Sequence, residues 1–136
     1  MLDFSPLLKG LALRMNCVPL LFAGLVEYPN GKKKLVVAGG RGRDNNFIQS
    51  TEILDLDSMQ WTSGQDIPDT VLAFSEIIQF EKTMLIVGGY KPNVAVDTIL
   101  QFDPETEGWI ERSEHLSSPK YHLTLLFVPD NAVNCQ

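Results

Sequence analysis

The chain has 136 residues, of which 44% are hydrophobic, so it can bury the core of one ordinary domain and is too apolar for a disordered chain. Its formal net charge of −6 would be repelled by phosphate backbones, which argues against nucleic acid as a partner. The two cysteines, Cys17 and Cys135, lack the spacing of a metal site or a redox pair.

The first 22 residues are predicted to be an N-terminal arm or linker, and two interpretations stay open for them. The apolar run from Cys17 to Val26 resembles a signal-peptide core, but Pro19 interrupts it and Asp3 weakens the basic start. The alternative is a linker that leads into a first strand. No apolar run reaches the roughly 18 residues that a membrane span needs. Because no Asn-x-Ser/Thr sequon occurs either, we expect a cytoplasmic protein.

From residue 23 onward the pattern predicts β-hairpins. Asn30-Gly31 lies between the apolar runs 23–28 and 34–38, and this dipeptide favours the positive φ of a hairpin turn. A second hairpin is predicted from residues 74–80 and 83–87. In both hairpins the second strand is apolar on consecutive residues, which is typical of a strand that is buried on both faces. Further strands are predicted near residues 50–54 and 98–102, from each tryptophan onward, and at Tyr121 to Val128.

The same plan occurs twice along the chain. Each copy has an apolar run, a glycine pair, a polar loop, a short strand, an acidic turn and a tryptophan. The glycine pairs Gly39-Gly40 and Gly88-Gly89 start 49 residues apart, and Trp61 and Trp109 are 48 residues apart. Self-similarity at one spacing is the signature of a repeat architecture. The glycines are interpreted as tight turns that a Cβ would obstruct, and the tryptophans as packing anchors.

The second copy contains Phe102-Asp103-Pro104-Glu105-Thr106 and then Trp109, and with its double glycine it resembles the kelch repeat. The first copy departs from that pattern, with Leu54-Asp55-Leu56-Asp57-Ser58 in place of the proline turn. The resemblance implies an all-β fold, because a kelch repeat forms one four-stranded blade of a β-propeller. We expect two complete blades and the first strand of a third, divided into residues 1–22 (arm), 23–65 (blade 1), 66–115 (blade 2) and 116–136 (truncated third blade).

The sequence carries no clear catalytic or metal-binding pattern. Gly40-Arg41-Gly42 is not a dinucleotide fingerprint, because Asn45 replaces the third glycine and no helical period follows. His115 and His122 have no acidic or cysteine partner at ligand spacing, so we interpret them as loop histidines. The sequence therefore predicts no catalytic residue, no metal and no cofactor. The rival class is a carbohydrate-active or copper-dependent propeller enzyme, whose residues would come from several blades.

The resemblance implies a non-catalytic protein-binding module. Relatives include substrate adaptors of cullin-type ubiquitin ligases and actin-binding proteins. Their loops after the double glycine and between blades open onto one face, which here would carry Arg41, Arg43, Asn45, Tyr90, Lys91, Asn93, Lys120 and Tyr121, with Asp69 nearby. Because guanidinium groups grip carboxylates, we expect an acidic segment of another protein as the partner. Val94 and Ala95 are placed in a loop, and Lys32 to Lys34 in a solvated turn.

An incomplete ring has a further consequence. Propellers use roughly four to eight blades, so two blades cannot close a ring by themselves. The outer blade faces would stay exposed, and we expect either self-association or completion by further blades.

Overall fold

A computed structural model describes residues 17–18, 22–42, 46–69, 75–91 and 93–122. Within these ranges the chain is all-β, as predicted, with ten strands and no helix. Sheet 1 consists of β2 (Phe22–Glu27), β3 (Lys33–Ala38), β5 (Thr51–Asp55) and β6 (Gln60–Ser63). Sheet 2 consists of β7 (Glu76–Phe80), β8 (Thr83–Lys91), β9 (Val94–Asp103) and β10 (Gly108–Glu111). The short strands β1 (Cys17–Val18) and β4 (Arg41–Gly42) pair with each other.

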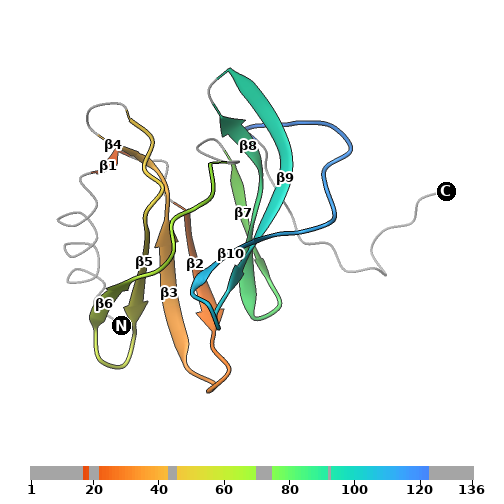
Figure 1. Cartoon of the computed structure of the whole chain (residues 1–136). Helices are drawn as coiled ribbons and strands as arrows, with labels where there is room; N and C mark the ends of the chain where they lie inside the picture. Colours follow the sequence, from red (N-terminus) through yellow and green to blue (C-terminus); the bar gives the residue numbers. More distant parts are fainter. Residues whose placement is uncertain (1–16, 19–21, 43–45, 70–74, 92, 123–136) are drawn as a thin grey trace.

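Both large sheets are antiparallel and their strands are in simple chain order, β2-β3-β5-β6 and β7-β8-β9-β10. They stand side by side in Figure 1, with the β2–β3 turn at the bottom and the β8–β9 turn at the top. Two four-stranded antiparallel sheets of this kind fit the blades of a propeller fragment, and they do not close into a ring. The two predicted units are therefore present as two sheets of one plan.

The predicted hairpin turns are also found. At the first one, Gly31 has φ +79° and its N–H donates to the Tyr28 carbonyl at 2.8 Å. At the second one, Glu81 has φ +51° between Phe80 and Thr83, which pair directly. Glycine adopts positive φ at no steric cost, whereas a glutamate does so at the expense of some backbone strain.

The core lies between the sheets. In sheet 1, one row across the strands consists of Gly24, Val36, Ile53 and Thr62. Val36 and Ile53 are fully buried and pack with Met84 and Phe102 of sheet 2. Ile86 and Leu100 of sheet 2 form a second cluster with Phe22 and Ala38 of sheet 1. We call this contact between the two sheets the seam.

Burial on both faces of the second strands is largely confirmed. Val36 and Val37 follow each other in β3, so they point to opposite faces, and both are fully buried. In β8 the neighbours Ile86 and Val87 are both buried, while Leu85 is only partly covered. The consecutive apolar run therefore marks burial on both faces at Val36-Val37 in β3 and at Ile86-Val87 in β8.

The two glycine pairs have the same backbone conformation. Gly39 and Gly88 have φ +63° and +61°, and Gly40 and Gly89 have φ +117° and +119°. A Cβ at Gly39 would lie 2.8 Å from the Phe22 ring and 3.0 Å from Ile67. The interpretation of the glycine pair as a crowded turn is thus confirmed at Gly39, and sheet 2 uses the pair for a β-bulge between Val87 and Gly89.

The acidic turns before the tryptophans are alike despite their different sequences. Asp55 accepts hydrogen bonds from the N–H groups of Asp57 and Ser58, both at 2.9 Å. Asp103 accepts them from the Glu105 N–H and the Thr106 hydroxyl. The Ser58 N–H lowers the pKa of Asp55, and the Thr106 hydroxyl lowers that of Asp103. A turn built on an aspartate cap tolerates the missing proline in the first copy.

Three expectations about loops and strands need correction. Val94 and Ala95 do not lie in a loop, because they pair with Lys91 and Tyr90 and so extend β9. The chain after the first glycine pair is also not simply a loop, since Arg41-Gly42 pairs with Cys17-Val18 of the predicted arm. Of the third unit, only Tyr121 and His122 of the predicted strand are described, and neither is in a strand. The rest of that strand, residues 123–128, lies outside the described residues.

Candidate functional site

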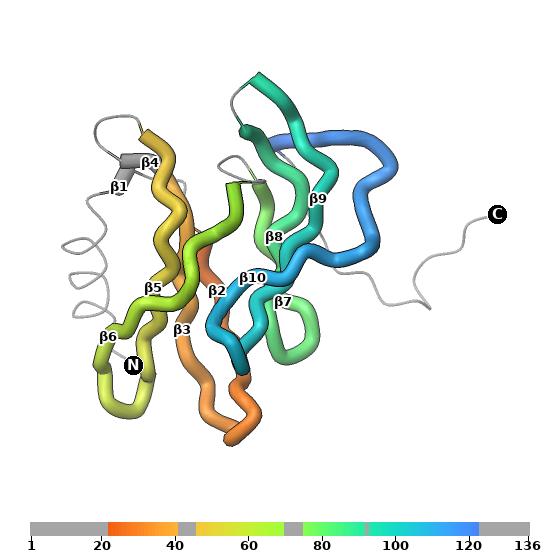
Figure 2. The backbone as a smooth tube through the Cα atoms, in the orientation of Figure 1, coloured from red at the N-terminus to blue at the C-terminus, as the bar shows by residue number. Residues whose placement is uncertain are grey.

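The structure brings five of the predicted partner-binding residues to one end of sheet 2. They come from the β8–β9 hairpin and from the segment that follows β10. Figure 2 shows this segment, in blue, leaving β10 and returning to the end where β8 and β9 meet. Its backbone is fixed there, because the Lys120 N–H donates to the Val96 carbonyl and the Gly89 N–H donates to the Lys120 carbonyl. We call these five residues the tip surface: Tyr90, Lys91, Asn93, Lys120 and Tyr121.

Aromatic rings dominate the tip surface. The rings of Tyr90 and Tyr121 meet edge to face, with centroids 5.6 Å apart. Tyr121 is half exposed and also contacts the His122 ring at 5.4 Å. The Tyr90 hydroxyl oxygen accepts a hydrogen bond from the Asn93 N–H at 3.0 Å, which holds the turn at Asn93 with φ +66°. The tip surface thus presents a supported aromatic pair flanked by Lys91 and Lys120.

Of the other predicted partner-binding residues, only Arg41 is described. Arg41 belongs to β4, which Figure 1 shows at the same end as the β8–β9 turn. Arg43 and Asn45 lie outside the described residues. Asp69 accepts a hydrogen bond from the Gln49 amide at 2.6 Å, and the same amide donates to the Ile67 carbonyl. Gln49 thus holds both Ile67 and Asp69 in the segment that follows β6.

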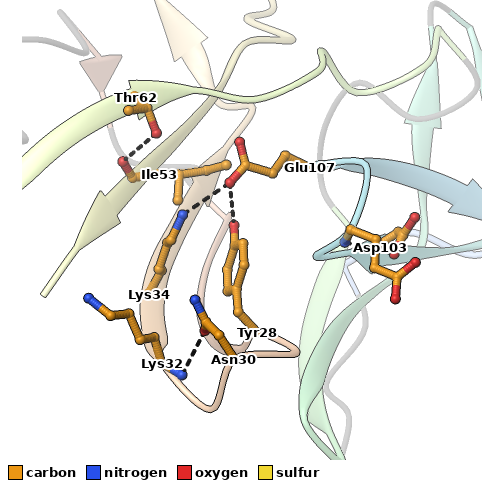
Figure 3. Close-up of polar contacts among 9 residues, drawn as sticks. Tyr28, Asn30, Lys32, Lys34, Ile53, Thr62, Asp103 and Glu107 are labelled. Atoms are coloured by element: carbon orange, nitrogen blue, oxygen red, sulfur yellow. Dashed lines mark hydrogen bonds and ion pairs between the residues drawn. The ribbon is translucent and has the colours of Figure 1, made fainter.

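Glu107 forms a polar node at the opposite end of the seam. Its Oε1 accepts hydrogen bonds from the Tyr28 hydroxyl at 3.0 Å and from Lys34 Nζ at 3.1 Å (Figure 3). Lys34 Nζ also lies 4.1 Å from the centroid of the Tyr28 ring. Burial raises the pKa of Tyr28, and the Glu107 carboxylate raises it further. This node joins the first hairpin of sheet 1 to the β9–β10 turn of sheet 2.

The prediction of a solvated lysine turn is accordingly wrong for one of its residues. The Lys34 side chain is only 19% exposed because it is held in the seam, while Lys32 is half exposed and pairs with Asp57 at 3.0 Å. Nearby, Lys82 pairs with Glu27 at 2.6 Å, and the Glu27 N–H donates to the Lys82 carbonyl. The Lys34–Glu107 and Lys82–Glu27 pairs each join a residue of one copy to a residue at a non-equivalent position of the other copy. A repeat pattern compares equivalent positions only, so it does not reveal these two contacts.

Trp109 anchors the seam. Its indole packs against both core clusters and meets the Phe102 ring edge to face, with centroids 5.3 Å apart. Its Nε1–H donates to Thr51 Oγ1 of sheet 1 at 2.9 Å. Trp61 occupies the same place in sheet 1, opposite Leu54 as Trp109 is opposite Phe102, but on the face turned away from sheet 2. The predicted role of a packing anchor is therefore observed directly for Trp109.

A cleft of about 530 Å³ opens between the hairpin turns of the two sheets. Its lining includes Glu27, Tyr28, Glu81, Lys82, Thr83 and Gln101. Glu27 and Lys82 neutralise each other, and the Thr83 hydroxyl donates to the Phe102 carbonyl. The polar groups that line the cleft are thus largely engaged in contacts within the protein.

The described residues show neither a metal-binding cluster nor a membrane-spanning helix. Among the described ranges, no three His, Cys, Asp or Glu side chains gather as a metal site would require. His115 does have an acidic neighbour that its sequence spacing concealed, since its Nδ1 lies 3.5 Å from Asp97 Oδ1. The structured part of the chain also contains no helix with the length and apolar character of a membrane span.

The described part of the chain is thus an all-β protein of two four-stranded antiparallel sheets, with two tyrosines and two lysines at one end of sheet 2. Comparison with protein-family models and with curated proteins returned no match.

Proposed function

We propose that this chain is a non-catalytic protein-binding module of the kelch type and that it recognises its partner through the tip surface. The observation that carries the proposal is the edge-to-face pair of the partly buried Tyr90 and the half-exposed Tyr121, which are next to Lys91 and Lys120 in the chain. Tyrosine supplies a large, rigid contact area at low entropic cost and is enriched where proteins bind one another. The module is proposed to act in the cytoplasm, as a ubiquitin-ligase adaptor or an actin-binding element.

An acidic segment is the partner that fits these residues. Lys91 and Lys120 bring positive charge to a chain whose net charge is −6, and Arg41 and Arg43 follow the first glycine pair in the sequence. Opposite charges would steer a partner that carries Asp or Glu toward this end, and would do so less effectively at high salt. The tyrosine rings would then bury the apolar part of the segment.

Selection from a displayed peptide library tests this proposal. With the purified chain as bait, we expect the enriched peptides to carry Asp or Glu, and Tyr121→Ala combined with Lys120→Ala to weaken their binding by about 2 kcal/mol or more. Arg41→Ala with Arg43→Ala should also weaken it. The Tyr121 and Lys120 side chains are exposed, so their variant should keep the thermal midpoint of the parent. We expect the arginine variant to keep it as well.

Lys32→Ala with Lys33→Ala is the matched control, since it removes two cations at the other end of the sheets. Binding that depends on this lysine pair and ignores the tip variants would overturn the face assignment. Enrichment of peptides without acidic residues would overturn the proposed partner chemistry.

Self-association is expected from the outer face of sheet 2. One row on that face consists of Ile78, Leu85, Gln101 and Ile110, and it corresponds to the buried row of sheet 1. Val36 and Ile53 of that buried row are 0% exposed, whereas Ile110 is 52% exposed. Arg112 covers part of the face, because its guanidinium lies over the Phe80 ring and donates to Gln101. The remaining apolar area favours association.

Light scattering after gel filtration measures this directly. We expect the apparent mass of the parent chain to rise with concentration, and Ile110→Lys to reduce that rise without lowering the unfolding midpoint. A parent chain that stays monomeric over the whole concentration range would show that the exposed row is not an association surface.

A further inference from the structure

We propose that Asn30 is a site of spontaneous deamidation and that its conversion loosens the seam. Asn30-Gly31 is the one Asn-Gly pair in the sequence. It forms the exposed turn between β2 and β3, at the hairpin that also carries Tyr28 and Lys34. This inference is independent of the proposed binding function.

The chemistry needs the backbone nitrogen of Gly31 and the side-chain amide of Asn30. The nitrogen gives up its proton and attacks Cγ of Asn30, so that an N–Cγ bond forms and a five-membered succinimide closes. The Cγ–Nδ2 bond breaks and Nδ2 leaves as ammonia. Water then opens the ring at either carbonyl, which gives aspartate or isoaspartate. Water is the only co-reactant, and no oxidant or reductant is involved.

Two features of the turn favour the attack. The Lys32 N–H donates to Asn30 Oδ1 at 3.0 Å (Figure 3), and this is the oxygen on which negative charge develops when the nitrogen adds to Cγ. The turn is also uncrowded at Gly31, because a Cβ there would meet no atom within 4 Å. A hydrogen-bond donor is thus already in place at the reacting amide.

One feature opposes the attack. The Gly31 N–H donates to the Tyr28 carbonyl at 2.8 Å, and this hydrogen bond must open before the nitrogen can act as a nucleophile. The folded chain should therefore react more slowly than a free peptide of the same residues. Since the turn is exposed and the bond lies in a short loop, the opening is a local fluctuation rather than global unfolding.

The products affect the seam through Tyr28. Isoaspartate adds one methylene to the backbone between residues 30 and 31, which shifts the Gly31 N–H away from the Tyr28 carbonyl. The Tyr28 hydroxyl and Lys34 both bind Glu107 across the seam, so a displaced hairpin weakens that node. Either product also adds a negative charge beside Lys32, in the same turn.

Asn93 provides an internal comparison. It also lies in an exposed turn with positive φ, at +66°, but its neighbour is Val94, whose branched side chain hinders ring closure. The two sites differ in the residue that follows the asparagine. Conversion at Asn30 and not at Asn93 is therefore the expected pattern.

The test incubates the full chain for days over a range of mildly alkaline pH and then maps peptides by mass spectrometry. We expect the tryptic peptide that ends at Lys32 to acquire the amide-to-acid mass shift, with isoaspartate detected by enzymatic methyl transfer from S-adenosylmethionine. The rate should rise with pH because the attacking nitrogen must lose its proton. The Asn93 peptide should keep its mass, and the aged chain should unfold at a lower temperature than fresh chain.

Asn30→Gln is the matched control, since it keeps an amide but disfavours the five-membered ring, and its unfolding temperature should not fall on ageing. A folded chain that keeps the Asn30 amide, while a synthetic peptide of residues 27–34 converts, would overturn the proposal. Equal conversion at Asn30 and Asn93 would overturn it as well. If Asn30 converts but the aged chain and aged Asn30→Gln unfold alike, the link to the seam is wrong.

Discussion

Trp109→Ala is expected to lower the free energy of unfolding by about 3 to 5 kcal/mol, as large aromatic truncations in cores do. The indole contacts both core clusters, so its removal leaves a cavity where the two sheets meet. The change also deprives Thr51, which is only 1% exposed, of its indole partner, and a buried polar group without a partner adds to the cost. Urea unfolding followed by far-UV circular dichroism measures the loss.

Trp109→Phe separates the two contributions. It keeps an apolar ring in the seam and removes the Nε1–H donor, so it should cost clearly less than Trp109→Ala. Equal losses for the two variants would assign the whole effect to the Thr51 hydrogen bond. A Trp109→Ala chain as stable as the parent would mean that the indole is not an anchor of the seam.

Gly39→Ala is expected to cost about 2 to 5 kcal/mol, since two penalties act together. At φ +63° an L-residue pays roughly 1–2 kcal/mol of backbone strain. The new Cβ would also lie 2.8 Å from Phe22 and 3.0 Å from Ile67, and overpacking of a core costs about 1–3 kcal/mol. The measurement is again the free energy of unfolding in urea.

Gly31→Ala is the matched control for Gly39→Ala. It has a similar φ of +79°, but its Cβ would point into open space, so only the backbone penalty remains. Gly89→Val should also destabilise the fold at φ +119°, whereas replacement of the exposed Val94 should matter little. A Gly31→Ala loss as large as that of Gly39→Ala would show that crowding at the glycine pair is unimportant.

The sheets could be predicted from the sequence because their determinants are local and repeated. The Asn30-Gly31 turn, the apolar runs and the glycine pairs each specify nearby backbone, and the structure has all of them. The turns at Asp55 and Asp103 show the same point, since an aspartate cap is enough to form each turn and the proline is not needed. Met59 and Glu107 occupy equivalent positions at the ends of these two turns, and both have a positive φ, 56° and 51°.

The seam could not be predicted in the same way. Glu107 receives its partners from residues 73 and 79 positions earlier, and Met59 stands in its place in the first copy. No spacing rule connects such residues. The pairing of Cys17-Val18 with Arg41-Gly42 was missed for a similar reason, because two-residue strands have no periodicity to detect.

The tip surface was predicted in part. Tyr90, Asn93, Lys120 and Tyr121 do come together, as the resemblance to kelch repeats implied, but the extension of β9 back to Val94 was not foreseen. The bulge between Val87 and Gly89 lets β8 continue past the glycine pair, and the alternating exposure of residues 94–100 follows that continuation. A glycine pair alone indicates a turn or a bulge and does not distinguish them.

Because the two sheets share one seam, we expect them to unfold as one unit. Urea unfolding of Trp61→Phe tests it most directly, because Trp109 is then the sole tryptophan and reports on the seam, while far-UV circular dichroism reports on both sheets. The predicted result is a single transition, with the Trp109 emission and the circular dichroism changing at the same midpoint. A Trp109 transition completed at lower urea than the circular dichroism transition would show that the sheets separate before they unfold, and would contradict this expectation.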